Sequence, residues 1–218
     1  MGIPKKPKKL RIVVFVDGQN FYKDCEDFFG HGATHPHLLG QEICHERFGP
    51  DRILQEVRYY TGIHAPRRDP AMNSYLQKRL SVMEKNGVTT FSRPLKYRDE
   101  YVEDKYNPGK IIKIPKGREK GVDVRIALDM VMMAIDGKYD IAALVSRDTD
   151  LNEAINDIYE IRENASRWMV VENVVCFPNI DPDTGVRPPL KRLRLAQRPI
   201  HIDQEIFNRI RDNTNYWK

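Results

Sequence analysis

Short apolar runs alternate with longer segments of helical periodicity along most of the chain. The clearest run, residues 10–16, is β-branched and almost continuously apolar, and it ends abruptly at Asp17-Gly18. Such a run is typical of a strand buried on both faces, as in a parallel sheet. Further strands are expected at residues 57–61, 88–91, 140–145 and 169–176.

Helical spacing occupies the stretches between these runs. Residues 122–135 are apolar on most sides, which predicts a buried helix. Asp150 and Glu153 have the spacing of a capping box at a helix start. Strands that alternate with helices predict an α/β fold with a mainly parallel central sheet. Helices are expected to start near Asn20, to span about 71–85, 122–135 and 150–163, and to close the chain after Asp203.

Three segments interrupt this alternation. Residues 29–49 contain glycines, a proline and four histidines, and we interpret them as a loop-rich insertion. Residues 93–118 are charged and broken by prolines, which favours an excursion from the core in the form of a hairpin. We therefore expect one domain over residues 10–176, and an arm and helix over 177–218 that pack on it, with the arm pairing at a sheet edge.

Acidic residues follow the expected strands, where ligands bind in parallel α/β sheets. Asp17 comes directly after the first strand, and Asp148 and Asp150 follow the strand at 140–145. Asp123 begins the preceding helix. If the two strands are neighbours, these four carboxylates meet at one end of the sheet. They would repel one another without a cation, and Mg²⁺ prefers such oxygen ligands. The pattern predicts phosphodiester hydrolysis by a metal-activated water.

Each acid also has a purely structural interpretation. Asp-Gly is a common turn pair, and Asp148 or Asp150 could simply cap a helix. Asp123 could be an acidic residue of the first helical turn that the helix dipole stabilises. Asp129, almost two turns further along its helix, is interpreted as structural or salt-bridged.

Composition narrows the function further. A net charge of +5 and a pI of about 9.0 favour polyanionic partners without proving nucleic-acid binding. No apolar run approaches the roughly 18–20 residues of a membrane helix. The three cysteines form no C-x-x-C pair, which fits a reducing cytoplasm, and the histidines with Cys44 match no zinc pattern.

Basic residues near the acids could hold phosphates, with solvated surface charge as the alternative. Tyr97, Tyr101 and Tyr106 could stack on unpaired bases, although packing of the hairpin is the favoured interpretation. The candidate RNA-binding residues are Arg67, Arg68, Lys116, Arg118, Lys120 and Arg147.

Other enzyme classes fit less well. No G-x-G-x-x-G follows the first strand and no G-x-S-x-G is present. Gln19 stands where an aspartyl phosphatase would carry its second acid. A Toprim-like domain would leave the Lys120-Gly121-Val122-Asp123 motif unexplained.

Three stretches, residues 13–20, 120–129 and 139–151, resemble the NYN domain family of PIN-like nucleases, which is related more distantly to FLAP nucleases. Tyr59-Tyr60-Thr61-Gly62 is also similar to that family's second strand. The resemblance covers roughly residues 10–176. It implies a PIN-like three-layer α/β/α sandwich, dependence on Mg²⁺ or Mn²⁺, and ribonuclease activity, with RNA as the partner and DNA as a second option.

The resemblance assigns roles by position. Asp17, Asp123, Asp148 and Asp150 match the family's catalytic, metal-binding acids, and Asn20 matches an asparagine that would orient a carboxylate or a water. Arg147 stands where the family usually has glycine, so it could bind phosphate or narrow the site. The alternative is a catalytically inactive RNA-binding or scaffold module of the same fold. A homodimer through the basic C-terminal segment is a further hypothesis.

Overall fold

A six-stranded parallel sheet forms the centre of the molecule. The computed structural model describes residues 4–45, 48–177, 193 and 195–217. The strands follow the order β3-β2-β1-β6-β7-β8, and every neighbouring pair is parallel. They are β1 (Leu10–Asp17), β2 (Arg52–Ile63), β3 (Val88–Pro94), β6 (Ile141–Val145), β7 (Val170–Cys176) and β8 (Gln197–Ile202).

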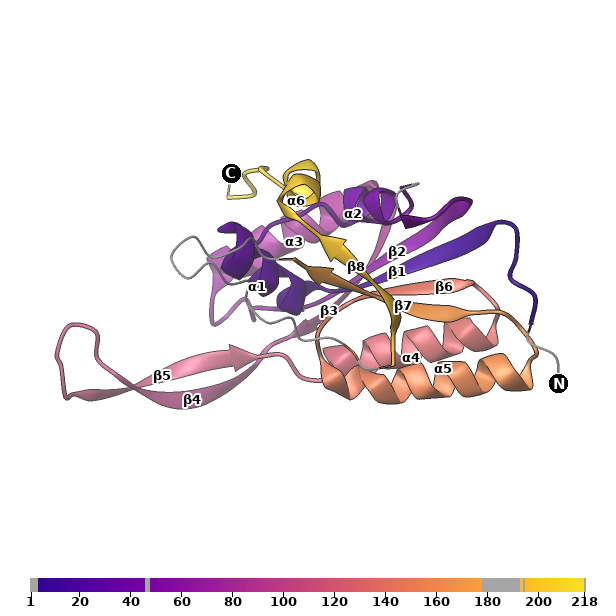
Figure 1. Cartoon of the computed structure of the whole chain (residues 1–218). Helices are drawn as coiled ribbons and strands as arrows, with labels where there is room; N and C mark the ends of the chain where they lie inside the picture. Colours follow the sequence, from indigo (N-terminus) through magenta and orange to yellow (C-terminus); the bar gives the residue numbers. More distant parts are fainter. Residues whose placement is uncertain (1–3, 46–47, 178–192, 194, 218) are drawn as a thin grey trace, which may run out of the picture.

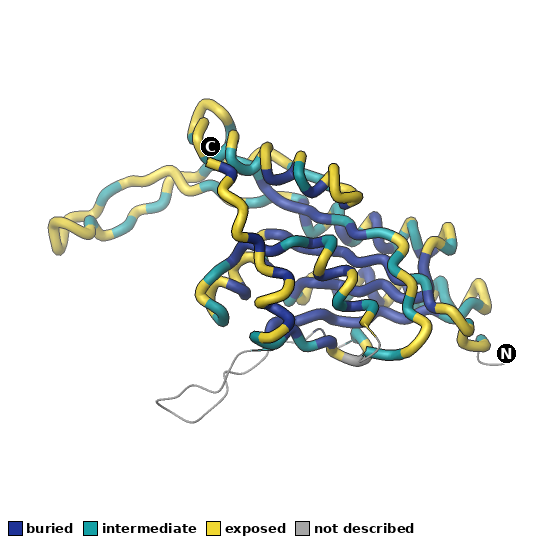
Figure 2. Tube along the Cα trace, turned by 90° about the horizontal axis from the view of Figure 1, so that it is seen from above, coloured by how far each residue is buried: buried dark blue, intermediate teal, exposed yellow. Residues whose placement is uncertain are grey.

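Helices cover both faces of the sheet (Figure 1). On β1, Val14 and Val16 pack into the core on one face, whereas Val13 and Phe15 pack into the core on the other. This alternation buries both faces, as the unbroken apolar run predicts. Figure 2 shows the buried strands running through the middle. The α/β three-layer prediction is confirmed. One layer holds α1 (Gly18–Phe29), α2 (Pro36–Ile43), α3 (Pro70–Lys85) and α6 (Gln204–Ile210), and the other holds α4 (Val122–Ile135) and α5 (Asn152–Asn164).

The strand order creates a switch point beside β1. The chain passes from β1 to β2 and β3 on one side, then returns to β6 on the other side. Helices that leave adjacent strands in opposite directions open a crevice at their carboxyl ends, which is where such sheets bind ligands. The β1–β6 register pairs Val16 with Val145, so Asp17 and Ser146 lie level with each other. The expected adjacency of these two strands is confirmed.

A two-stranded antiparallel hairpin projects from this body (Figure 1). It consists of β4 (Lys96–Glu103) and β5 (Ile111–Arg118), and most of its residues are exposed. The hairpin interpretation of residues 93–118 is confirmed.

The loop interpretation of residues 29–49 is wrong for α2. Pro36 stands at the start of this helix, where its missing N–H costs no hydrogen bond. Leu39 and Ile43 are fully buried, and Gly40 faces Val57 so closely that a Cβ there would lie 2.6 Å from it. Tertiary packing therefore stabilises a helix whose glycine content suggested a loop.

Two expectations about helices are also wrong. Helix α4 is not buried on most sides, because Val124, Leu128, Met132 and Ile135 are 54–56% exposed. The expected capping box is absent, since α5 begins after Leu151 without a side-chain cap. Asp148 instead caps the short 3₁₀ turn η2 (Thr149–Leu151) by accepting from the Asp150 N–H.

The end of the chain extends the same sheet. Strand β8 pairs with β7 at the edge, and Asp203 caps α6 as expected. No helix in the described ranges has the length and apolar content needed to cross a membrane. The division of the chain at residue 176 stays a prediction. The homodimer also stays a prediction, because most of the basic residues proposed to form it lie outside the described residues: Arg187, Lys191, Arg192 and Arg194.

Candidate active site

Asp17 is the buried acid at the centre of the candidate site. Its side chain is 4% exposed and caps α1, accepting from the Asn20 N–H at 3.2 Å and from Asn20 Nδ2 at 2.5 Å. Ser146 Oγ donates to Asp17 Oδ2 at 3.1 Å. Burial raises the pKa of Asp17, the Asn20 and Ser146 donors oppose that rise, and the charge of Asp148 adds to it. Capping and a functional role are thus compatible at this residue.

The loop after β6 carries Asp148 and Asp150. Ser146 Oγ accepts from the Asp148 N–H at 3.1 Å, and Asp148 Oδ1 accepts from the Asp150 N–H at 3.0 Å. The buried Asn173 on β7 donates to the Ser146 carbonyl at 2.8 Å, which ties this loop to the next strand. Asp148 is half-buried, whereas Asp150 is exposed.

Glu119 is an acid that the sequence analysis missed. It is half-buried between β5 and α4, and the Gly62 N–H donates to its Oε1. Burial raises the pKa of Glu119 to about 7; the Gly62 hydrogen bond opposes this rise, and the charges of Asp17 and Asp123 add to it. Asp123 lies in the first turn of α4, as expected. The signal for Glu119 was its place directly before the Lys-Gly-Val-Asp motif.

The predicted acids lie at one end of the sheet, but their side chains are not arranged as a set of metal ligands. Across the described ranges, no group of three His, Cys, Asp or Glu side chains is arranged to hold a metal ion. Asp17 nevertheless interacts electrostatically with Asp148 and with Glu119. Oxygen donors that raise one another's pKa are what a hard divalent cation would neutralise. The residues present fit such an ion, and their roles as ligands stay predictions.

Arg147 points toward α1. It forms an ion pair with the buried Asp24, and its guanidinium lies 5.5 Å from the centre of the Phe28 ring. Asp129 is likewise held by charge, accepting from Tyr60 at 2.9 Å and pairing with Arg125 at 2.7 Å. The ion pairs expected for Asp129 are present, while phosphate binding by Arg147 stays a prediction.

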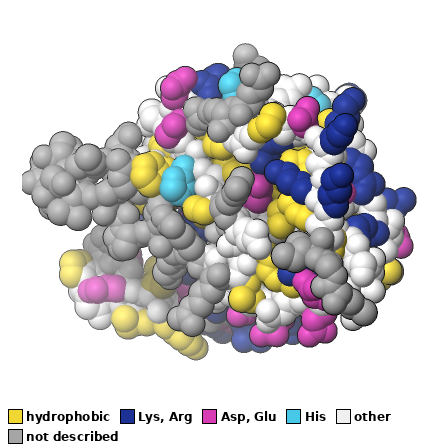
Figure 3. Space-filling view, turned by 45° about the vertical axis from the view of Figure 1, so that its right-hand side comes forward, with side chains coloured by type: hydrophobic (Ala, Val, Ile, Leu, Met, Phe, Trp, Pro, Cys, Tyr) yellow, Lys and Arg dark blue, Asp and Glu magenta, His cyan; other side chains and the backbone are white. Residues whose placement is uncertain are grey.

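Positive charge lines two hollows at the base of the hairpin. A hollow of about 380 Å³ contains Arg118, Lys120 and Glu119, and one of about 560 Å³ contains Arg67 and Arg68. Lys116 and Arg118 both pair with Glu100 across the hairpin, which neutralises part of their charge. Lys and Arg side chains also gather at the right-hand edge of Figure 3, so charge alone does not locate the site.

Comparisons with known proteins bear on the family and the fold of this chain. The sequence profile of the NYN domain matches residues 11–165. A crystal structure of a protein of unknown function from Vibrio parahaemolyticus, VPA0982, is 18% identical, with a TM-score of 0.52 over 92% of this chain and 98% of that one. MurG of Acinetobacter baumannii, at 8% identity and a TM-score of 0.32 over 88% of this chain and 45% of its own, is too distant to support an argument. No curated protein matches the chain. Because the profile spans most of the sheet and its acids, the chain belongs to the NYN domain family.

Proposed function

We propose that this chain is a metal-dependent endoribonuclease that hydrolyses RNA phosphodiester bonds at the β1–β6 crevice. The observation that carries the proposal is the buried carboxylate of Asp17, which Asn20 and Ser146 hold at the switch point of the sheet. Burying a carboxylate is costly unless hydrogen bonds or a cation compensate for its lost hydration. A buried acid with a raised pKa in such a crevice is a candidate for catalysis.

The acids of the crevice would hold Mg²⁺ or Mn²⁺, with Asp17, Asp123, Asp148 and Asp150 as the ligands. A bound ion of this kind supplies activation of water and neutralisation of the phosphate charge. Asn20 and Ser146 orient the Asp17 carboxylate through their hydrogen bonds. Because the pKa of Glu119 is raised to about 7, its carboxyl group can hold or release a proton near neutral pH.

The basic hollows support a nucleic-acid substrate. Lys120 is exposed and lies three residues before Asp123, and Arg67 and Arg68 line the neighbouring hollow. Lys and Arg make most contacts to phosphates, and such contacts do not separate RNA from DNA. The preference for RNA over DNA rests on the resemblance to the NYN domain family. The exposed Tyr101 and Tyr106 on the hairpin also offer surfaces on which unpaired bases could stack.

A second candidate is a non-catalytic RNA-binding module of the same fold. Arg147 favours it, because an arginine ion-paired to Asp24 stands where the family usually has glycine.

Cleavage of end-labelled RNA separates the two candidates. Single-stranded and structured RNA, with DNA controls, are incubated with Mg²⁺, Mn²⁺ or EDTA. We expect metal-dependent internal cuts that Asp148→Asn abolishes. Asp157→Asn, the same change at an exposed position of α5, is the matched control and keeps full activity. No cleavage of RNA or DNA under any condition would overturn the nuclease proposal.

A further inference from the structure

A cavity of about 370 Å³ opens beside the candidate active site. It lies between the start of α1, the end of β2 and the start of α3. Gly18 and Gln19, the two residues after Asp17, line it together with Glu119. A group held in this cavity would therefore be a direct neighbour of the proposed reaction centre.

Aromatic rings form much of the cavity wall. Tyr75 and Trp217 approach with ring centres 4.7 Å apart and planes inclined by 30°. Trp217 is 57% exposed and Tyr22 is 39% exposed, so the rings of these two residues are not fully covered by the core. The wall presents large flat apolar surfaces that remain open to solvent.

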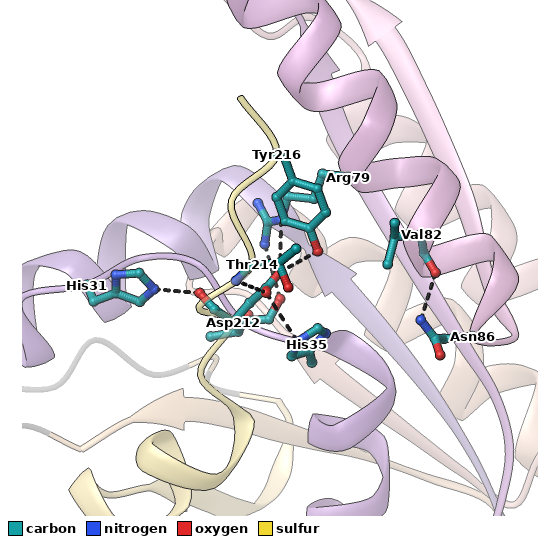
Figure 4. Close-up of polar contacts among 9 residues, drawn as sticks. His31, His35, Arg79, Val82, Asn86, Asp212, Thr214 and Tyr216 are labelled. Carbon is teal, nitrogen blue, oxygen red and sulfur yellow. Dashed lines mark hydrogen bonds and ion pairs between the residues drawn. The ribbon is translucent and has the colours of Figure 1, made fainter. Parts of the chain in front are cut away.

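The position of Trp217 is determined by an anchor in the preceding tail. Asp212 is buried and accepts from the Thr214 N–H at 2.9 Å and from the Tyr216 hydroxyl at 2.8 Å. His35 Nε2 lies 3.1 Å from its carboxylate (Figure 4). The Tyr216 ring also packs edge-on against Tyr75, at 5.7 Å between ring centres. These contacts hold the C-terminal tail over the cavity.

Polar groups accompany the rings. Gln19 and His64 line the cavity, and so does Arg79, which is only 4% exposed. The Arg79 guanidinium lies 5.8 Å from the centre of the Tyr59 ring. Arg79 is held by protein partners: its Nε forms an ion pair with the Asp212 carboxylate at 4.0 Å, and its Nη2 donates to the Thr34 carbonyl at 3.1 Å.

We propose that this cavity binds an unpaired nucleobase of the RNA strand next to the phosphodiester bond that is cut, with the base stacked on an open face of the ring pair that Tyr75 and Trp217 form. The cavity volume lies at the lower end of the roughly 300–1,000 Å³ range of ligand pockets. Bases of single strands stack on aromatic side chains, whereas a base inside a duplex has both faces covered by its neighbours. The proposal rests on the proposed function for the RNA, and it restricts the substrate class to single-stranded or looped segments.

The test measures binding separately from cleavage. Trp168 is the only other tryptophan of the chain, so Trp168→Phe leaves Trp217 as the sole indole reporter. This full-length variant is titrated with a single-stranded RNA oligomer in EDTA, and again in Mg²⁺ with Asp148→Asn added to prevent cutting. We expect saturable quenching of Trp217 by the single strand and much weaker quenching by a duplex of the same sequence. No quenching in either condition would overturn the proposal.

Ring removal tests the stacking itself. Tyr75→Ala is expected to weaken binding of fluorescein-labelled single-stranded RNA by about 5- to 100-fold, since a base gains roughly that factor from one aromatic surface. Tyr75→Phe, which keeps the ring, is the matched control and should bind normally. Trp217→Ala provides a second variant at an exposed position, where folding is not at risk. Unchanged affinity in both alanine variants would refute the base-binding cavity.

The two proposals fail in different ways. Quenching of Trp217 without cleavage in any metal would leave the cavity intact and overturn the nuclease. Metal-dependent cleavage that is equally efficient in Tyr75→Ala, without quenching of Trp217, would leave the nuclease intact and overturn the cavity.

Discussion

Replacing Glu119 with glutamine removes a carboxyl group whose ionisation opposes folding. Burial raises the pKa of Glu119 from 4.5 to about 7. Between these values the unfolded chain loses a proton that the folded chain keeps, so the free energy of unfolding falls as the pH rises. Above about pH 7 the Glu119 carboxyl is ionised in both the folded and the unfolded chain. The folded chain then bears the full free-energy cost of burying this charge. Glutamine carries no charge at any pH, and its side-chain oxygen can still accept from the Gly62 N–H.

The size of the effect follows from the same shift. Each tenfold step in the equilibrium is worth about 1.4 kcal/mol, so the rise to about 7 corresponds to about 3 kcal/mol at most. Because Glu119 is only half-buried, solvent screening reduces this, and we expect about 1–3 kcal/mol. For a chain of 218 residues, 1 kcal/mol shifts the Tm by about 2–4 °C. Glu119→Gln should therefore raise the Tm by about 2–12 °C at pH 8, relative to its effect at pH 4.5.

Thermal unfolding of both proteins, followed by circular dichroism in EDTA from about pH 4.5 to 8, measures this. Glu160→Gln, the same change at an exposed position of α5, controls for the loss of one charge and should show no such pH dependence. Added Mg²⁺ should shrink the difference, since a cation among the acids relieves their repulsion. A Tm difference between wild type and Glu119→Gln that is the same at every pH would refute the reasoning.

Three further predictions concern the same end of the sheet. Mg²⁺ or Mn²⁺ should raise the Tm of the wild type and not that of Asp17→Asn, and a flat wild-type response would count against the metal site. Ser146→Ala removes the donor to Asp17, so the metal affinity read from Tm titrations should fall about 10- to 100-fold; unchanged affinity would contradict this positioning role. Arg147→Ala leaves the buried Asp24 without its ion pair and should cost about 1–3 kcal/mol in urea unfolding, most of which Asp24→Asn should restore. Additive effects in that pair would show that the ion pair contributes little.

Local periodicity was sufficient for the main elements of the fold. The apolar run at residues 10–16 predicted β1, and the spacing over residues 71–85 predicted α3 to within a residue. Strands that are buried on both faces leave a continuous apolar signal that needs no tertiary information. Helix α2 escaped detection because eight residues with a glycine carry little helical signal, and its packing against β2 stabilises it.

The candidate site was predictable only in part, because some of its residues are brought together only by tertiary packing. Asp17 and Asp148 follow strands, and in a parallel sheet that places them at the ligand-binding end. Glu119 follows an exposed strand of the hairpin. The rule that ligands bind after the strands of a parallel sheet therefore did not identify it. Its raised pKa arises from burial and from the nearby charges of Asp17 and Asp123, which the fold brings together.

The sequence by itself therefore determined the α/β layering, the hairpin and the acids at the strand ends, because each depends on neighbours within a few residues. Tertiary structure alone decided how Arg147 is held, how far α4 is exposed and where the C-terminal tail lies. Arg147 pairs with Asp24, more than a hundred residues earlier, and Trp217 meets Tyr75 across a similar separation. Contacts between residues so far apart leave no periodic trace in the chain, since only the three-dimensional fold brings the partners into contact.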